Sequence, residues 1–207
     1  MVITYFGVSS IKVQFGDLTI AVNPVSKQSE LNQSKYKADI ALVSLQHPDF
    51  NGIDNVTFGD TKPFAITGPG EYELKDVVIQ GLASHSAYAG GDWINTMYLL
   101  TIENMNLCFL GGLDTKDIPK EALEKIGEVD IVFVPVSGEG VLSPAHANSC
   151  AVGLEPKLIV PLQYTDASLK AFLKEAGENP EPLDKLTIKR KDLDGKEGDV
   201  VVLTSQK

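Results

Sequence analysis

Short apolar runs separated by glycine and polar turn residues dominate the first part of the chain. Between them stand Gly7 and the pair Gly16-Asp17, which are typical of tight turns. Runs of this length with turn residues at both ends predict β-strands. One run is apolar throughout and ends at the polar pair Gln46-His47, so we expect a strand covered on both faces. The four runs are residues 2–6, 11–15, 18–22 and 38–45.

The same pattern continues to about residue 110. Lys75-Asp76 divides two apolar runs and predicts a β-hairpin, and the polar residues 103–106 divide another pair of runs. We expect these strands at residues 64–67, 72–74, 77–82, 95–102 and 107–110.

Helical periodicity begins after residue 110. Residues 117–126 carry apolar side chains at helical spacing behind a proline. Ser143-Pro144 is typical of an N-cap and the first residue of a helix, and Gly177 of a helix end. The expected helices are 117–126, 143–154 and 165–176, the strands 130–136 and 157–162, and a last hairpin joins 187–189 to 199–204.

The order of these elements predicts one domain over residues 1–207, because no linker or internal repeat divides the chain. Periodicity alone indicates the α/β or α+β class. Two β-rich halves that each acquire helices fit a four-layer αββα sandwich. A hydrophobic content of 43% and a charged content of 22% are those of a globular protein, which excludes disordered and low-complexity chains.

The charge balance limits the classes of partner that we expect the chain to bind. The chain has 18 Lys and Arg against 28 Asp and Glu, a net charge of −10. This balance argues against nucleic acid or an anionic membrane as the main partner. No apolar run approaches the roughly 20 residues of a membrane-spanning helix, and the first residues lack the pattern of a signal peptide. A basic cluster alternates with aspartates and is interpreted as a solvated hairpin; it contains Lys185, Lys189, Arg190 and Lys191.

The two cysteines, Cys108 and Cys150, lie in or beside apolar segments and form no Cys-x-x-Cys pair. Buried free thiols of this kind are typical of a reducing compartment, so we expect a cytoplasmic protein.

Candidate chemistry begins where the strand at residues 38–45 ends. His47 and Asp49 follow it in a polar loop. In binuclear zinc hydrolases such a strand end carries the pattern His-x-His-x-Asp-His. Two His one residue apart point the same way from an extended segment and share one metal, whose bound water supplies hydroxide near a pKa of about 7.

A series of segments in the expected order resembles the metallo-β-lactamase superfamily, in the branch of ascorbate-6-phosphate lactonases. The resemblance implies the αββα fold and covers all but about the last forty residues. The segments are 3–10, 20–24, 68–73, 81–85, 95–98, 109–113, 134–138, 155–157 and 161–164.

The resemblance also implies a degenerate metal site. The three His of the family's first metal site fall on Leu45, His47 and His85, and the Asp and two His of the second fall on Asp49, Phe50 and Gln163. The Asp that bridges both metals falls on Gly112. Leu, Phe and Gly side chains cannot coordinate zinc, and Gln163 is at best a weak neutral ligand. His47, His85 and Asp49 are thus the remaining ligands.

Other residues have two interpretations each. Glu71 and Glu73 share one face of an extended segment, but the preceding glycines favour a turn followed by a strand. Trp93, in a glycine-rich loop, either contacts a ligand or anchors that loop. We interpret His146 as a helix-surface residue rather than a ligand. Gln163, Glu71, Trp93 and Gly112 are the candidates for lining a pocket.

We expect a protein of this fold that does not catalyse hydrolysis and binds a small molecule, a protein or a second copy of itself, without a cofactor. The alternative is a hydrolase of an ester, lactone or phosphodiester with an altered single-metal or metal-free site. Its catalytic residues would be His47, Asp49 and His85, with a residual zinc or other divalent ion.

Overall fold

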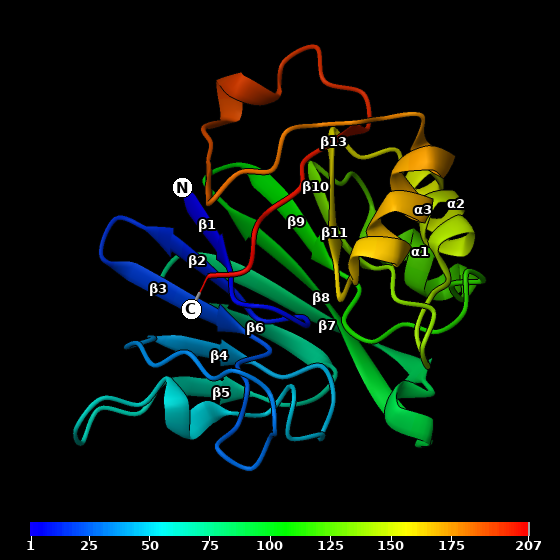
Figure 1. The fold of residues 1–207 in the computed structure, drawn as a ribbon. Helices are drawn as coiled ribbons and strands as arrows, with labels where there is room; N and C mark the ends of the chain where they lie inside the picture. Colours follow the sequence, from blue (N-terminus) through cyan, green and yellow to red (C-terminus); the bar gives the residue numbers. More distant parts are fainter. Residues whose placement is uncertain (207) are drawn as a thin grey trace.

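Two β-sheets packed face to face form the centre of the protein, which we describe from a computed structural model of residues 1–206 (Figure 1). The first sheet has six strands in the order β12-β1-β2-β3-β4-β5. Its strands are β1 (Val2–Tyr5), β2 (Ile11–Phe15), β3 (Leu18–Val22), β4 (Ile40–Leu42), β5 (Phe64–Ile66) and β12 (Leu186–Thr187).

The second sheet has seven strands in the order β13-β11-β10-β9-β8-β7-β6. The neighbouring strands from β6 through β9 pair antiparallel. The neighbouring strands β9, β10, β11 and β13 pair parallel. Its strands are β6 (Gly70–Leu74), β7 (Val77–Ser86), β8 (Trp93–Ile102), β9 (Met105–Phe109), β10 (Ile131–Pro135), β11 (Leu158–Leu162) and β13 (Asp199–Val200).

The side-chain alternation of the strands builds the core between the sheets. On β2, Ile11 and Val13 are buried against the second sheet, while Lys12 between them faces the other way. Tyr98 of β8 is fully buried and its hydroxyl donates to the carbonyls of Val43 and Ile66, both at 3.0 Å. The sheets are therefore joined by polar contacts as well as by apolar packing.

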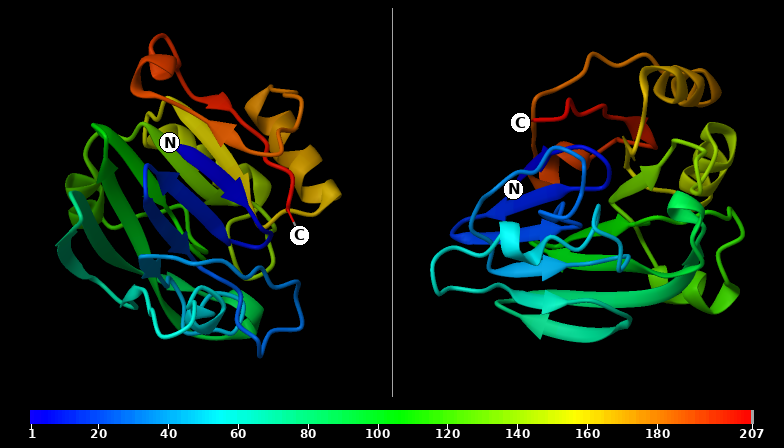
Figure 2. Two further views of the ribbon diagram at one scale, coloured as in Figure 1. Left: turned by 90° about the vertical axis from the view of Figure 1, so that its left-hand side faces the viewer. Right: turned by 60° about the horizontal axis from the view of Figure 1, so that its bottom comes forward.

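Three helices cover the outer face of the second sheet, and the turned views of Figure 2 show them on that side only. They are α1 (Lys120–Ile126), α2 (Pro144–Gly153) and α3 (Asp166–Ala176). Ser143 caps α2, as its sequence predicts, and Thr165 caps α3. Helix α1 begins only after Pro119, because the residue before a proline avoids the helical conformation.

The outer face of the first sheet has a thinner cover. Small residues such as Ala21 and Ala41 face it, and the irregular segments 23–39 and 47–63 pack there around the 3-10 turn η1 (Ile53–Asn55). In residues 1–206 this layer contains no α-helix. The architecture is the two-sheet sandwich of the metallo-β-lactamase fold, with short turns in place of helices on this side.

The last hairpin predicted from the sequence is wrong. Strand β12 pairs antiparallel with β1 in the first sheet, whereas β13 pairs parallel with β11 in the second. The four basic residues of the cluster are exposed, as expected, but they form no hairpin. Arg190 and Lys191 belong to the 3-10 turn η3 (Arg190–Leu193), whose Leu193 is buried and whose Arg190 lies 3.1 Å from Asp130 Oδ1. Packing of β12 into the first sheet and of β13 into the second thus outweighs the pairing of the two strands with each other.

Cys108 and Cys150 are buried free thiols, as expected. Burial raises the pKa of the Cys150 thiol to about 11. Within residues 1–206, none of the helices has the length and apolar character needed to cross a bilayer.

Candidate functional site

The segments that the sequence singled out meet where β4, β7, β9 and β11 end. Asn95, fully buried on β8, binds the loop that follows β9. Its Nδ2 donates to the Leu110 carbonyl at 2.9 Å, and its Oδ1 accepts from Gly112 N at 2.9 Å. Thr96 N donates to the Ser44 carbonyl at 2.9 Å. The loops after β4 and β9 are therefore held against β8.

His47 and Asp49 lie side by side in the loop after β4. Asp49 N donates to His47 Nδ1 at 3.2 Å, and His47 Nδ1 is 3.5 Å from Asp49 Oδ2. The Asp49 carboxylate is otherwise engaged, since it accepts from Ser29 Oγ at 2.5 Å and from the Tyr88 hydroxyl at 2.7 Å. His47 therefore makes a local hydrogen bond, whereas the Asp49 carboxylate bonds to segments that are distant in the sequence.

Tyr88, a residue that the sequence did not single out, covers these two side chains. It begins the 3-10 turn η2 (Tyr88–Gly90) between β7 and β8. Its ring meets His47 edge-on at 5.1 Å and buried Phe50 at 4.9 Å between centroids. Burial raises the pKa of Tyr88, and its hydrogen bond to the Asp49 carboxylate raises it further. The phenol therefore stays a proton donor.

His85 points to other partners. Strand β7 is longer than predicted and carries His85 near its end, with the side chain half exposed. Its Nδ1 is 2.7 Å from Asp114 Oδ2 and its Nε2 is 2.9 Å from Asp92 Oδ1. Hydrogen bonds to Asp92 and to Asp114 raise its pKa, because both carboxylates favour the imidazolium form. Both ring nitrogens are thus occupied by carboxylates.

The side chain of Leu45 occupies the space into which a side chain at position 112 would extend. A Cβ atom at Gly112 would lie 2.7 Å from Leu45 Cδ1 and 2.9 Å from Ser86 Oγ. Leu45 is fully buried and Phe50 likewise. Hydrocarbon therefore fills the volume next to Gly112, and any larger side chain there would collide with it.

Gln163 follows β11 in the left-handed conformation, with φ of 52°, and is 7% exposed. Its Nε2 donates to Ser9 Oγ at 2.5 Å and to the Gly111 carbonyl at 3.2 Å. Its Oε1 is buried without a hydrogen-bond partner among residues 1–206. Gln163 thus cross-links the segment after β11 to the loops of Ser9 and Gly112.

The remaining candidates lie apart or have local roles. Glu71 is exposed on β6 and accepts from Gln80 Nε2 at 3.3 Å. Trp93 is half-buried, meets His47 edge-on at 5.7 Å and donates from Nε1 to the Tyr88 carbonyl at 2.9 Å. It therefore anchors the loop after β7. His146 is exposed on α2.

The candidate site thus consists of two separate clusters. One joins His47, Asp49 and Tyr88; the other joins His85 to Asp92 and Asp114. Among residues 1–206, no group of three or more His, Cys, Asp or Glu side chains is arranged to hold a metal ion. Three of these residues, Tyr88, Asp92 and Asp114, were missed from the sequence, because only the folded loops bring them to their partners.

Comparison with known proteins agrees with the fold. Residues 2–163 match the family model of the beta-lactamase superfamily domain. A UPF0173 metal-dependent hydrolase of Lysinibacillus sphaericus is 26% identical over 196 residues, 79% of this chain and 85% of the relative. A UPF0173 metal-dependent hydrolase of Listeria monocytogenes is 23% identical over 207 residues, 83% of this chain and 88% of the relative.

Solved structures give the same assignment. A crystal structure from Thermotoga maritima, assigned to the Zn-dependent hydrolases of the metallo-β-lactamase superfamily, superposes with a TM-score of 0.79 and 27% identity, covering 98% of this chain and 97% of that one. A Parabacteroides distasonis structure has a TM-score of 0.66 at 21% identity, covering 97% and 91%, and shares the fold. The chain therefore belongs to the metallo-β-lactamase superfamily, and the relatives described above are named metal-dependent hydrolases.

Proposed function

We propose that this chain does not perform the metal-assisted hydrolysis after which its relatives are named, and that it acts by binding a small molecule, a protein partner or a second copy of itself. The observation that carries the proposal is the filled space at Gly112. A bridging carboxylate there would need the volume that Leu45 Cδ1 occupies, 2.7 Å from the position of a Cβ atom.

The donor set also does not fit the metals that the family implies. A catalytic zinc ion normally takes three protein ligands and leaves one position for water. The Asp49 carboxylate is bonded to Ser29 and Tyr88, and the two nitrogens of His85 face Asp114 and Asp92. What remains is His47 and the neutral Oε1 of Gln163. Two such groups are too few for a catalytic zinc, and we derive no reaction step through one.

Metal analysis tests this proposal. We expect protein purified without chelators to contain well below one equivalent of zinc, iron and manganese together, and to show no hydrolysis of ester, lactone or phosphodiester substrates. Near-stoichiometric, tightly held metal would overturn it. So would turnover that a chelator abolishes and that added metal restores.

A second candidate is a metal-free hydrolase in which His85, oriented by Asp114, acts as a general base through Nε2 once the exposed Asp92 carboxylate moves away from it. The 2.7 Å contact between Nδ1 and the Asp114 carboxylate favours it, because such a contact orients the ring and stabilises its protonated form. Activity that is lost in His85→Ala and retained in His146→Ala, whose side chain is exposed on α2, would support it. Equal activity in both variants would exclude it.

A further inference from the structure

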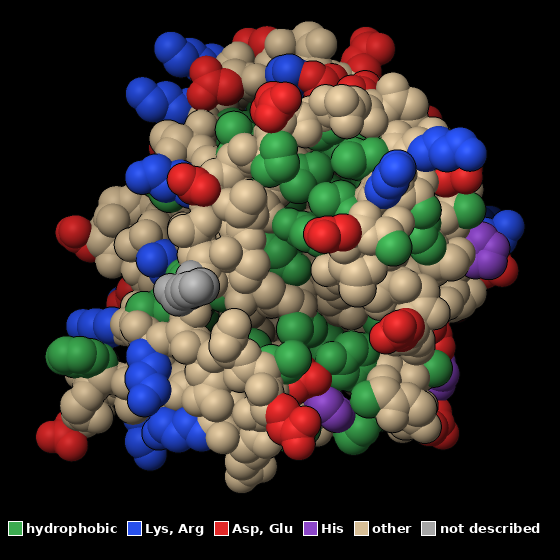
Figure 3. All heavy atoms as spheres, in the orientation of Figure 1, with side chains coloured by type: hydrophobic (Ala, Val, Ile, Leu, Met, Phe, Trp, Pro, Cys, Tyr) green, Lys and Arg blue, Asp and Glu red, His purple; other side chains and the backbone are tan. Residues whose placement is uncertain are grey.

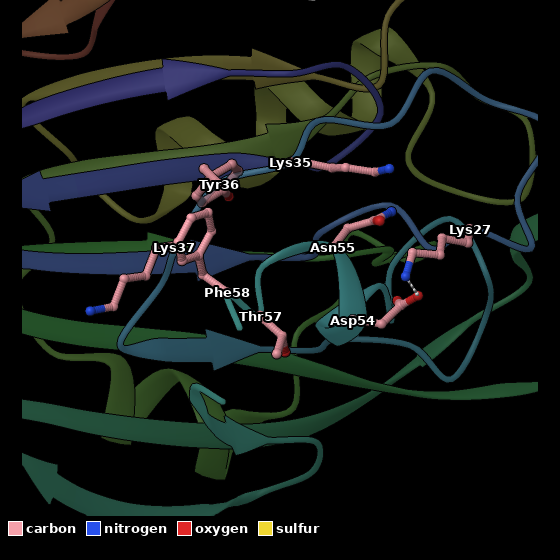
Figure 4. A pocket seen from close by; sticks show the side chains of 8 residues that line it. All are labelled: Lys27, Lys35, Tyr36, Lys37, Asp54, Asn55, Thr57 and Phe58. Carbon is pink, nitrogen blue, oxygen red and sulfur yellow. Dashed lines mark ion pairs between the residues drawn. The ribbon is translucent and has the colours of Figure 1, made fainter. Parts of the chain in front are cut away.

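A cavity of about 450 Å³ lies in the thin layer over the outer face of the first sheet (Figure 4). Its walls are the segment before β4 and the residues around η1. These two segments run together, since Tyr36 N donates to the Asn55 carbonyl at 3.3 Å and Ala38 N to the Val56 carbonyl at 3.0 Å. The cavity shares no lining residue with the clusters around His47 and His85. Its volume is that of a small-molecule site.

The cavity is basic although the chain is acidic. Three lysines and one aspartate line it: Lys27, Lys35, Lys37 and Asp54. Lys27 is paired with Asp54 at 3.2 Å, whereas Lys35 and Lys37 form no ion pair within residues 1–206. Figure 3 shows many of the basic side chains on the same side of the molecule, over the first sheet. In a chain with a net charge of −10, this local excess of lysines forms a surface that attracts anions.

Aromatic rings form one end of the cavity. Phe58 is 71% exposed, an unusual position for a large apolar side chain. Tyr36 is held by stacking on Phe6 at 5.3 Å, with Lys12 Nζ 5.2 Å from the Tyr36 ring centroid. In the view of Figure 4 the rings of Tyr36 and Phe58 lie together, while Lys35, Lys27 and the Asn55 amide lie toward the opposite end.

Two buried polar atoms of the lining lack partners. Asn55 is only 2% exposed, and its Nδ2 donates to the Val25 carbonyl at 2.7 Å and to Gln33 Oε1 at 3.3 Å. Its Oδ1 has no partner among residues 1–206, and the same holds for the Tyr36 hydroxyl. Buried polar atoms of native proteins are normally hydrogen-bonded. Asn55 Oδ1 is enclosed as well as unpartnered, so a ligand donor reaches it only after a neighbouring side chain moves.

We infer that the cavity binds a small phosphorylated compound with a planar ring, of the mononucleotide class. The lysine ammonium groups are point charges suited to a phosphate. The exposed Phe58 offers a stacking surface for a heteroaromatic ring. This inference goes beyond the proposed loss of hydrolysis and is independent of any metal.

Calorimetric titration of the full chain with three probes tests the inference: adenosine monophosphate, adenosine and inorganic phosphate. We expect adenosine monophosphate to bind at least about tenfold more tightly than either of the other two, because it alone engages both ends of the cavity. Lys35→Gln and Phe58→Ala should each weaken its binding by about fivefold to tenfold. Lys170→Gln on α3 and Phe64→Ala on β5, exposed residues outside the cavity, should leave it unchanged.

Three outcomes would overturn the inference. The first is an absence of binding up to about 5 mM adenosine monophosphate. The second is binding of phosphate as tight as that of the nucleotide, which indicates surface lysines alone. The third is equal weakening by the two control variants. Because Lys35 and Phe58 are exposed, their variants should fold, which a variant of the buried Asn55 need not do.

Discussion

Single residues around the candidate site hold unusual backbone conformations. Val8, Asn23 and Gln163 have φ values of 51°, 49° and 52°, in the left-handed region that β-branched residues above all avoid. Each is supported by a contact: Asn23 Oδ1 accepts from Ser44 N at 2.7 Å, and Gln163 N donates to the Val8 carbonyl at 2.8 Å. Such strain gathers at functional sites, and here it lies beside the candidate site.

Gly112→Asp should destabilise the fold by about 2 kcal/mol, because overpacking a filled core typically costs 1–3 kcal/mol. The new Cβ would meet Leu45 Cδ1 at 2.7 Å. Urea unfolding would measure the loss. Leu45→Ala in the same chain should recover part of it as a coupling energy, and Gly153→Asp, where nothing lies within 4 Å of a new Cβ, is the matched control. Equal losses at both glycines would contradict this account.

The pKa of His85 should lie above its ordinary value of 6.5, as an NMR titration of its ring would show. Because the folded pKa is raised, the stabilisation is fully present below the unfolded pKa. It is lost as the pH rises through the folded pKa. Asp114→Asn should lower the pKa, since the carboxylate 2.7 Å from Nδ1 becomes neutral. Asp117→Asn is the control, and an unchanged pKa in Asp114→Asn would disprove the coupling.

At the scale of elements, the sequence predicted the strands and helices whose signals are local. The cap at Ser143, the helix end at Gly177 and the turn at Gly16-Asp17 fall where expected, because a side chain or a glycine within a few residues decides each. Strand β7 extends four residues beyond its prediction, to Ser86, because it pairs with β8 along its whole length. The last hairpin fails because its two strands pair in different sheets.

Asp130 connects several elements and should be the most costly carboxylate to remove. It is 6% exposed and lies before β10. Its Oδ1 is 2.8 Å from Lys157 Nζ and 3.1 Å from Arg190 Nη1, and Asn106 N donates to its Oδ2 at 2.8 Å. Asp130→Ala should lower the free energy of unfolding by about 3 kcal/mol, the lower end for a broken buried pair, because both cations are partly exposed.

Urea unfolding of Asp130→Ala beside Asp194→Ala would check this value. Asp194 is an exposed aspartate next to η3 and forms no ion pair within residues 1–206, so its variant should change stability by less than about 0.5 kcal/mol. If the two variants lose the same stability, Asp130 does not hold these elements together.

For the whole molecule, the sequence was enough to predict the fold, because ordered segments along most of the chain each resemble one family. The same resemblance predicted that His47, Asp49, Gln163 and Gly112 belong to one site. It did not predict that Tyr88 would cover Asp49 or that Asp92 and Asp114 would take both nitrogens of His85. These contacts span 39, 7 and 29 residues, and they depend on how the loops close over the sheet edge rather than on a local pattern.

The state of the metal site can be measured through the stability of the whole chain. A ligand at 100 times its Kd stabilises a protein by about 2.7 kcal/mol, and 1 kcal/mol shifts the Tm of a domain of this size by about 2–4 °C. A micromolar zinc site would therefore raise the Tm by about 5–10 °C in 100 µM zinc. We expect a change below about 1 °C, because the Asp49 carboxylate and both nitrogens of His85 are already engaged. A rise of 5 °C or more that His47→Ala removes and His146→Ala retains would show that a metal site survives here.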